Sequence, residues 1–492
     1  MSPREWPPLP IVAVLVALLG ITALAPSADL EAEPADDLPI EQSQLVCPVL
    51  DASRPGAATA LDAAQGEPTE PVAPGEQAGS LTVSALTAPP GTPPVATATD
   101  LSRPLVVAFA GSDLLVDAAG PAAAGLVASH LEAQPEGAAR ALAGGSCGAA
   151  AVQAWYVGGG GAVGQRSTLF LANAEASPAT VEVGAWSEAG PVSPDRPTIV
   201  TVPARGRSEV ALDGLAPGAA RVAVSVRAVT GRVSSSVLDR RVEGASPRGA
   251  DWIAAGALAR TLVVGPLPAA EGGSRLLHIA VPGDRDAVVQ VRVVTPDGAF
   301  APAGGEVFEV PAGTVAEVDA TAFAEGREVA VELASDVPIA ATARLVRPGE
   351  GGISEEAFVS GVRPADEPGP LAVAESRASP DVVSTLLVSA PQAAFRGTLR
   401  LIPVDPALPA SSAPVEVAAG TTAVLPLTPP APGSFSVVLE PASGSGPAEA
   451  VRSMVWTLAK GPAITTQRLD RVVTSVPAPR TAPDLGAGLP GH

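Results

Sequence analysis

The chain has 492 residues, of which 47% are hydrophobic but only 3% aromatic, so Val, Leu and Ala must fill the cores of about three or four domains. Its formal net charge of −21 argues against nucleic acid as a partner, because phosphate contacts need clustered basic side chains. Gly and Pro number 50 and 54, and many of them separate alternating runs, where turns need them.

The first predicted element is a membrane helix at residues 9–25, which contains an uncharged apolar run from Ile11 to Ala25 and follows a short cytoplasmic N-terminus at 1–8. Its 17 residues give about 25 Å of helix, the short limit for a membrane span of about 30 Å. A cleaved signal peptide is the alternative, because Ala23-Leu24-Ala25 has the pattern of a cleavage site. Since Pro26 would follow that cut and is unfavourable there, we favour an uncleaved transmembrane signal anchor. Both alternatives place the rest of the chain outside the cytoplasm, either tethered as a single-pass membrane protein or secreted.

The next segment, residues 26–77, is rich in Ala, Pro and acidic residues and predicts an extended stalk. It contains Cys47, and the second of the two cysteines is Cys147. An even cysteine count in an exported chain favours a disulfide, which would tie the stalk to the start of the first repeat. In the chain-entropy account, a disulfide that closes the loop from Cys47 to Cys147 would stabilise the folded state by roughly 4–5 kcal/mol. The alternative is a pair of buried free thiols.

Residues 78–160 predict a smaller, divergent β region, and one motif in it suggests chemistry. Ser146 lies in a G-x-S-x-G pattern, which in a hydrolase needs a strand before it, a helix after it and a histidine partner. The segment that follows looks like a strand, and neither His130 nor His278 stands in a relay pattern with Ser146. We therefore interpret Ser146 as part of a half-cystine turn, and predict that function does not depend on these three residues.

Three later stretches repeat one pattern, with a period of about 110 residues that is typical of β-sandwich domains. Each begins with Ser-x-Leu at Ser167, Ser274 or Ser384, continues into an alternating strand and then turns at a Val-x-Ala corner that ends in glycine. The sequence predicts a mainly β fold of tandem Ig-like or fibronectin-like antiparallel β-sandwich repeats after the transmembrane helix. The three predicted repeats are residues 161–245, 270–350 and 380–460. The connectors between them are residues 243–273 and 361–383, and a flexible tail follows at residues 461–492.

Two further patterns have structural explanations that involve no ligand. The glycines from Gly159 to Gly164 match G-x-G-x-x-G, but a strand follows instead of the helix that a dinucleotide site requires. Asp284 and Asp286 could bind calcium from a sandwich loop, yet Asx turns explain them equally well. We expect no cofactor and no metal site.

The stretch around Trp155 and Tyr156 is the most distinctive in the chain. Neighbouring residues on a strand face opposite ways, so one ring would anchor a core and the other could face outward; core packing is the better interpretation for both. Cys147, the run Trp155-Tyr156-Val157-Gly158-Gly159 and the run Leu169 to Asn173 resemble an uncharacterised actinobacterial family of exported or membrane-anchored β-sandwich proteins. Members often have Pro after the equivalent of Asn173, where this chain has Ala174.

The resemblance supplies no catalytic residues and implies a setting in the actinobacterial cell envelope. We therefore predict a non-enzymatic, membrane-tethered scaffold or interaction protein whose partner is an envelope protein or a glycan. The alternative is a carbohydrate-binding accessory protein for envelope polysaccharide assembly, which the scarcity of aromatic residues disfavours. An enzyme is disfavoured by the lack of a nucleophile, acid–base or metal cluster in the sequence pattern.

Overall fold

The computed structural model of the chain describes residues 37–49, 56–64, 79–99, 102–108, 111–137, 140–193 and 195–478. These residues form mainly antiparallel β-sheets, which confirms the predicted β class. No helix in these ranges is long and apolar enough to cross a membrane, and the predicted anchor at residues 9–25 lies outside them. The helical segments in the described ranges are η1 (Gly120–Ala123), α2 (Leu212–Leu215), η2 (Phe323–Gly326) and η3 (Glu350–Gly352).

The chain divides into two compact units. In the first, made of residues 1–38 and 475–492, the described residues contribute to a short two-stranded sheet of β1 (Asp37–Pro39) and β37 (Ser475–Pro477). The second unit, Pro39–Thr474, holds four β-sandwiches, and the rest of the description concerns this unit.

The sandwich that contains the first predicted repeat, here the second sandwich, shows how alternation builds the fold. Strand β13 (Ala179–Ser187) alternates buried and half-buried residues along its length, as expected where one face covers a core. Its Val181 and Val183 meet Leu169 and Val237 of the opposite sheet in one apolar cluster. One sheet holds β11 (Gln153–Val157), β17 (Val222–Thr230), β13, β14 (Gly190–Val192) and β15 (Thr198–Val202); the other holds β16 (Gly206–Ala211), β12 (Gln165–Asn173), β18 (Ser234–Glu243) and β19 (Ser246–Ile253).

The first sandwich has the same two-layer construction and contains the predicted disulfide. Cys47 and Cys147 are bonded and belong to its core, together with Leu81 and Val116. Part of the predicted stalk at residues 26–77 therefore forms strands of a folded domain, namely β2 and β3. One sheet is β10 (Gly148–Ala149), β2 (Gln42–Cys47), β7 (Leu114–Ala119), β4 (Ser80–Ala85) and β5 (Ala96–Ala98); the other is β6 (Leu105–Ala108), β3 (Gly56–Asp62), β8 (Leu126–Gln134) and β9 (Ala141–Ser146).

The third sandwich is built around one long strand, β26 (Val329–Pro348), which takes part in both layers. Its first half pairs with β20 (Ala259–Leu267) and β22 (Ala287–Thr295), and β22 also pairs with β23 (Gly298–Phe300) and β24 (Val307–Val310). Its second half pairs with β21 (Ser274–Ala280) and β27 (Ser354–Ser360), and β21 also pairs with β25 (Val315–Asp319).

The fourth sandwich repeats the arrangement of the second. One sheet has the order β31 (Ser411–Val417), β30 (Phe395–Pro403), β33 (Gly433–Pro441), β28 (Leu371–Ala378) and β36 (Asp470–Arg471). The other has the order β32 (Thr421–Pro426), β29 (Val382–Ala390), β34 (Glu449–Leu458) and β35 (Gly461–Arg468).

The repeated landmarks occupy equivalent places in the second, third and fourth sandwiches. Ser167, Ser274 and Ser384 lie in β12, β21 and β29, each of which pairs with the long strand of the next-to-last hairpin, β18, β26 or β34. The Val-x-Ala corners connect β15 to β16, β24 to β25 and β31 to β32.

The boundaries of the units differ from those predicted. Strands β19 and β20 lie in the predicted connector 243–273, β28 lies in the connector 361–383, and β35 lies in the predicted flexible tail. Periodicity misses these strands because they are largely covered on both faces: the first six residues of β28 are buried, as are the last five of β19.

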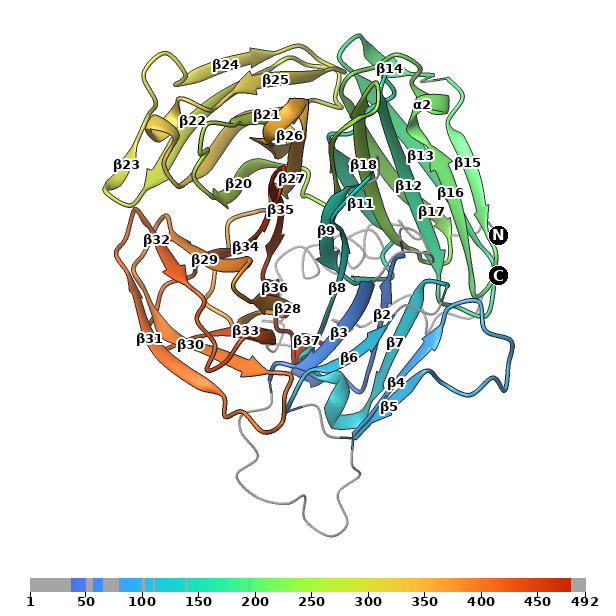
Figure 1. Cartoon of the computed structure of the whole chain (residues 1–492). Helices are drawn as coiled ribbons and strands as arrows, with labels where there is room; N and C mark the ends of the chain where they lie inside the picture. Colours follow the sequence, from blue (N-terminus) through green and yellow to red (C-terminus); the bar gives the residue numbers. More distant parts are fainter. Residues whose placement is uncertain are drawn as a thin grey trace, which may run out of the picture. The chain divides into compact units, whose positions relative to one another are not determined.

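The four sandwiches meet through their last edge strands, here called the inner strands: β9, β19, β27 and β35. Strand β9 contacts β19, β19 contacts β27, β27 contacts β35, and β35 contacts β9, so the inner strands close a ring (Figure 1). The residues after β35 complete the closure, because β36 pairs with β28 and the amide of Gly125 donates to the carbonyl of Val473. The repeats are thus packed laterally around one centre, and do not form beads on linkers.

Candidate functional site

The ends of the inner strands surround a cavity of about 470 Å³ to which all four sandwiches contribute. The last residue of each inner strand lines it: Ser146, Ile253, Ser360 and Arg468. Rim residues such as Ala254 and Arg471 are exposed, so the cavity opens to solvent within the described part of the chain. A volume of this size lies in the range of small-molecule sites, about 300–1,000 Å³.

A buried polar centre lies between the inner strands, and Asp251 of β19 is its main acceptor. Its carboxylate accepts hydrogen bonds from the amide of Gly144 in β9 at 3.0 Å and from the hydroxyl of Thr465 in β35 at 3.0 Å. Burial raises the pKa of Asp251 well above its ordinary value. One side chain of the second sandwich therefore binds the first and fourth sandwiches as well.

Glu355 of β27 has a parallel role between the third and first sandwiches. It accepts from the amide of Leu142 at 3.2 Å and lies 3.5 Å from the guanidinium of Arg140. Strand β9 pairs with β8 along one edge only, so Leu142 and Gly144 turn their amides toward the centre, where Glu355 and Asp251 accept them. Carboxylates thus satisfy a sheet edge that would otherwise carry unpaired donors.

A second pair of acidic residues joins the third sandwich to the second. Glu356 lies 3.3 Å from Arg241 and accepts from Arg344 at 2.6 Å, and Arg241 also pairs with buried Asp239. Burial raises the pKa of Glu356 to about 7, although both arginines act to lower it. Arg241 is therefore shared by acidic groups of two sandwiches.

On the floor of the cavity, Ser146 connects the first sandwich to the C-terminal end of the fourth. Its hydroxyl donates to Asp470 at 2.9 Å and accepts from the amide nitrogen of Gln467 at 3.0 Å, and Gln467 also donates to Ser129. Burial raises the pKa of Asp470 to about 7, against the lowering effects of Ser146 and Arg468. No helix follows Ser146; the chain continues through Cys147 into β10.

His130 also lines the cavity, on the strand next to Ser146, which the sequence pattern did not indicate. It lies opposite Gly145 in the β8–β9 ladder and meets Trp252 edge to face, with ring centroids 5.2 Å apart. Burial lowers its pKa to about 3, so the ring is neutral at physiological pH. In the described structure no hydrogen bond joins His130 to Ser146, and the pair lacks the geometry of a nucleophile and its base.

The other predicted residues have structural places. Tyr156 lies in the core of the second sandwich and donates from its hydroxyl to the carbonyl of Ser235 at 2.6 Å, while Trp155 packs on Trp186. Asn173 donates to the carbonyl of Ser177 at 2.8 Å and so holds a turn. Both rings of the Trp-Tyr pair are therefore buried.

The two glycines that follow the Trp-Tyr pair, Gly158 and Gly159, have φ angles of 115° and 76°. A Cβ at Gly159 would lie 2.9 Å from the hydroxyl of Ser167, so the turn requires glycine there.

His278 and the loop aspartates lie outside the cavity lining. His278 is buried with its Nε2 3.0 Å from Glu317, and burial lowers its pKa. Asp286 accepts from the amide of Ala312 at 2.8 Å; because the two residues are 26 positions apart, this bond joins two loops and is not the Asx turn expected from the sequence. Within the described residues there is no group of three or more His, Cys, Asp or Glu that could hold a metal ion.

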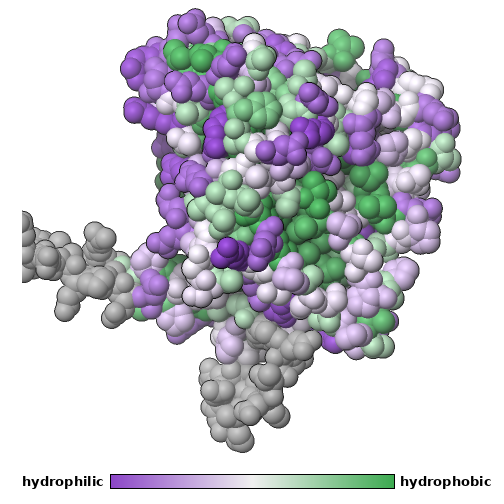
Figure 2. Space-filling model, turned by 90° about the vertical axis from the view of Figure 1, so that its left-hand side faces the viewer, coloured by the Kyte–Doolittle hydropathy of each residue, from purple (hydrophilic) through white to green (hydrophobic). Residues whose placement is uncertain are grey.

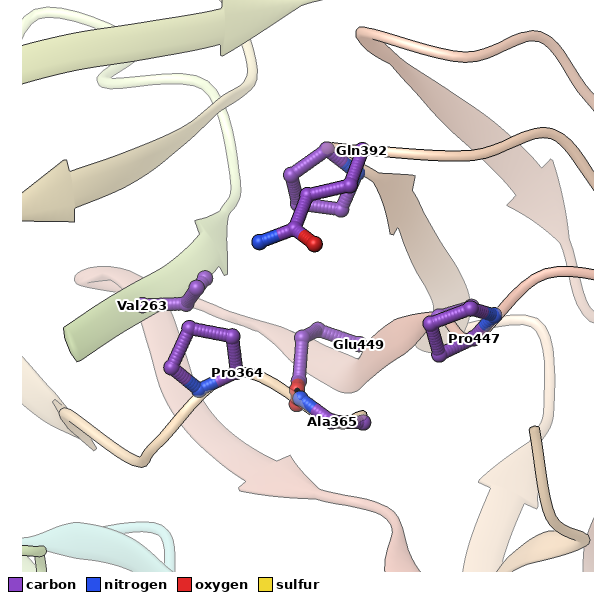
Figure 3. A pocket seen from close by; sticks show the side chains of 8 residues that line it. Val263, Pro364, Ala365, Gln392, Pro447 and Glu449 are labelled. Carbon is purple, nitrogen blue, oxygen red and sulfur yellow. Dashed lines mark hydrogen bonds between the residues drawn. The ribbon is translucent and has the colours of Figure 1, made fainter. Parts of the chain in front are cut away.

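A separate crevice between the third and fourth sandwiches is too small for a ligand. Figure 3 shows Val263, Pro364, Gln392, Pro447 and Glu449 around it, and its volume is about 10 Å³, room for no more than a water molecule. Behind it, Arg468 donates to Glu449 at 2.6 Å and to the carbonyls of Gly265 and Ser360 at 3.1 Å. The crevice is a packing seam that Arg468 closes.

The residues of the polar centre escaped prediction, although one signal could have found them. The ends of the inner strands, at Ser146, Ile253, Ser360 and Arg468, are spaced about 107 residues apart, close to the period of the Ser-x-Leu pattern. That period, continued in both directions along the chain, reaches the first sandwich and the predicted tail. Asp251, Glu355 and Asp470 each lie within a few residues of these positions.

The fold and its centre define a class: an all-β protein of four antiparallel sandwiches that are joined through buried polar inner strands. Residues 95–428 match the family of unknown function DUF5719, and the chain belongs to that family. The match confirms the expectation of a family without assigned activity.

No curated protein matches this chain. Among solved structures, that of Thermotoga maritima 1070 is 16% identical, with 21% of this chain and 94% of that chain covered, at a TM-score of 0.18. A tetra-tandem repeat from the extending region of a large adhesion protein is 14% identical, with 87% and 99% covered, at a TM-score of 0.09. Scores this low establish no shared fold.

Proposed function

We propose that this chain is a non-enzymatic interaction protein of the actinobacterial cell envelope. Four Ig-like or fibronectin-like sandwiches act as one scaffold, held outside the membrane by the apolar run at residues 9–25. The disulfide between Cys47 and Cys147 supports an oxidising compartment, since such bonds are rare in the cytosol.

The observation that carries the proposal is the use made of polar residues at the centre. Asp251, Glu355 and Ser146 each hold groups from at least one other sandwich. A side chain that is committed to such bonds is poorly placed to transfer protons to a substrate, because catalysis would break the contacts that join the domains. The polar centre therefore favours a rigid scaffold over an active site.

Partner binding would use the outer faces, where such folds offer exposed loops and sheet edges. On the third sandwich, Phe300 and Val307 are exposed beside a groove of about 610 Å³. Figure 2 shows the side of the molecule that carries the third and fourth sandwiches, with apolar areas between hydrophilic ones. This surface is suited to a protein partner.

The test is complementation of a deletion strain with Ser146→Ala and, as a matched control, Ser384→Ala. Each substitution removes a hydroxyl that donates one hydrogen bond, from Ser146 to Asp470 and from Ser384 to the carbonyl of Arg377. Ser146 also accepts from Gln467, which keeps Ser129 as an acceptor when the Ser146 hydroxyl is removed. Each should cost about 1 kcal/mol of stability. We expect both variants to complement fully at normal abundance.

Asp251→Leu, which breaks the polar centre, should complement poorly. Loss of function in Ser146→Ala alone, at wild-type abundance and melting temperature, would replace the scaffold proposal by an enzymatic one.

A further inference from the structure

We infer that the central cavity binds a small, neutral, polyhydroxylated ligand, of the size of a mono- or disaccharide. The inference goes beyond the proposed scaffold role and does not depend on it. It starts from the polar groups of the cavity that the described structure leaves without partners, and from the charges that stand beside them.

Most polar side chains of the lining are already engaged, and five keep a polar atom without a partner in the described structure. Two of these atoms are ring nitrogens of His130 and Trp252 that are buried away from solvent, and the other three belong to Asp470, Ser43 and Ser236. Asp470 uses one carboxylate oxygen for Ser146, and its second oxygen has no partner among the described residues. The hydroxyls of Ser43 and Ser236 also line the cavity without a hydrogen bond in that part of the chain. These free groups offer one strong acceptor and two hydroxyls that can donate or accept, which is the complement of a ligand rich in hydroxyl groups.

The charges of the lining favour a neutral ligand over an ion. Ionised Asp470 lies within two residues of Arg468 and Arg471, so an ion of either sign would meet a like charge as well as an opposite one. Arg468 is held by Glu449, and Arg471 donates to the carbonyl of Glu367 at 2.7 Å, so both are fixed in place. An uncharged ligand meets neither penalty.

The remaining lining is aliphatic and aromatic. Half-buried Leu45 and Leu126 of the first sandwich and Val362 after β27 offer apolar surface to the C–H faces of a ring. An apolar wall with a few oriented polar groups is the usual composition of a small-molecule site. The combination distinguishes a sugar-like ligand from a fully polar one.

The experiment is calorimetric titration of the full chain with glucose, galactose, maltose and trehalose, and with butylammonium and acetate as charged probes. We expect at least one sugar to bind with a dissociation constant of about 1 mM or below, and neither ion to bind. At pH 8.5, above the pKa of about 7 that burial gives Asp470, Asp470→Asn should weaken that binding about tenfold, since it replaces a charged acceptor by a neutral one. The matched control, Asp284→Asn, removes an exposed carboxylate of the third sandwich outside the cavity and should leave binding unchanged.

A second variant keeps the test decisive if Asp470→Asn lowers the melting temperature. Ser236→Leu adds an apolar side chain to the cavity from β18, keeps Asp470 unsubstituted and should abolish binding. Absence of binding by every sugar, binding of a charged probe in their place, or sugar binding that survives both substitutions would each overturn the inference.

Discussion

Replacement of Asp251 by leucine should loosen the centre of the ring, because it removes the acceptor that three inner strands share. Leucine has the same branched arrangement of heavy atoms as aspartate, with two larger methyl groups in place of the oxygens, and offers no acceptor to the amide of Gly144 or to the hydroxyl of Thr465. Each buried donor left without a partner costs about 1–3 kcal/mol, so the two together should cost about 2–6 kcal/mol.

Hydrogen exchange read out by mass spectrometry measures this loss where it occurs. Peptides that cover β9 and β35 should exchange at least tenfold faster in Asp251→Leu, since each 1.4 kcal/mol corresponds to a factor of ten. Peptides from the outer strand β15 should be unchanged, because that strand lies on the far sheet of the second sandwich.

Asp251→Asn is the matched control, because it keeps the shape and one acceptor oxygen. Burial already raises the pKa of Asp251 well above its ordinary value, so an uncharged group is tolerated at this position. We expect its exchange rates to stay within about fivefold of wild type, or about 1 kcal/mol. Equal rates in the wild-type chain and Asp251→Leu would refute the claim that this carboxylate holds the sandwiches together.

The remaining predictions concern pH and the N-terminus. Folding raises the pKa of Glu356 from 4.5 to about 7, so between these pH values the folded state holds a proton that the unfolded state has lost. This difference contributes about 3 kcal/mol to the free energy of unfolding. The contribution is complete below pH 4.5 and is lost as the pH rises through 7. The melting temperature should therefore be higher at pH 5.5 than at pH 8.5, and Glu356→Gln should reduce the difference; an unchanged slope would exclude Glu356 as its source. Sequencing of the mature N-terminus should find residues 9–25 retained, whereas a start near Asp29 would mean a cleaved signal peptide and a secreted protein.

The local pattern of the sequence determined the strands and the pairing of the cysteines. Alternation along β13 reflects a strand with one face on a core and one toward solvent, a property that each segment carries by itself. The bond between Cys47 and Cys147 followed from an even cysteine count in a chain that the apolar run at residues 9–25 predicts to be exported. The repeat of Ser167, Ser274 and Ser384 likewise placed equivalent strands in three of the four sandwiches.

Only the tertiary structure decided how the sandwiches meet and what lies between them. The inner strands are buried on both faces, so they lack alternation and resemble linkers in the sequence. Asp251 and Glu355 look like surface residues in their local context, because their partners are Thr465 and Leu142, more than two hundred residues away. A carboxylate is recognised as a structural acceptor only when the unpaired amides of another sheet edge stand opposite it, and closure of the ring creates that arrangement.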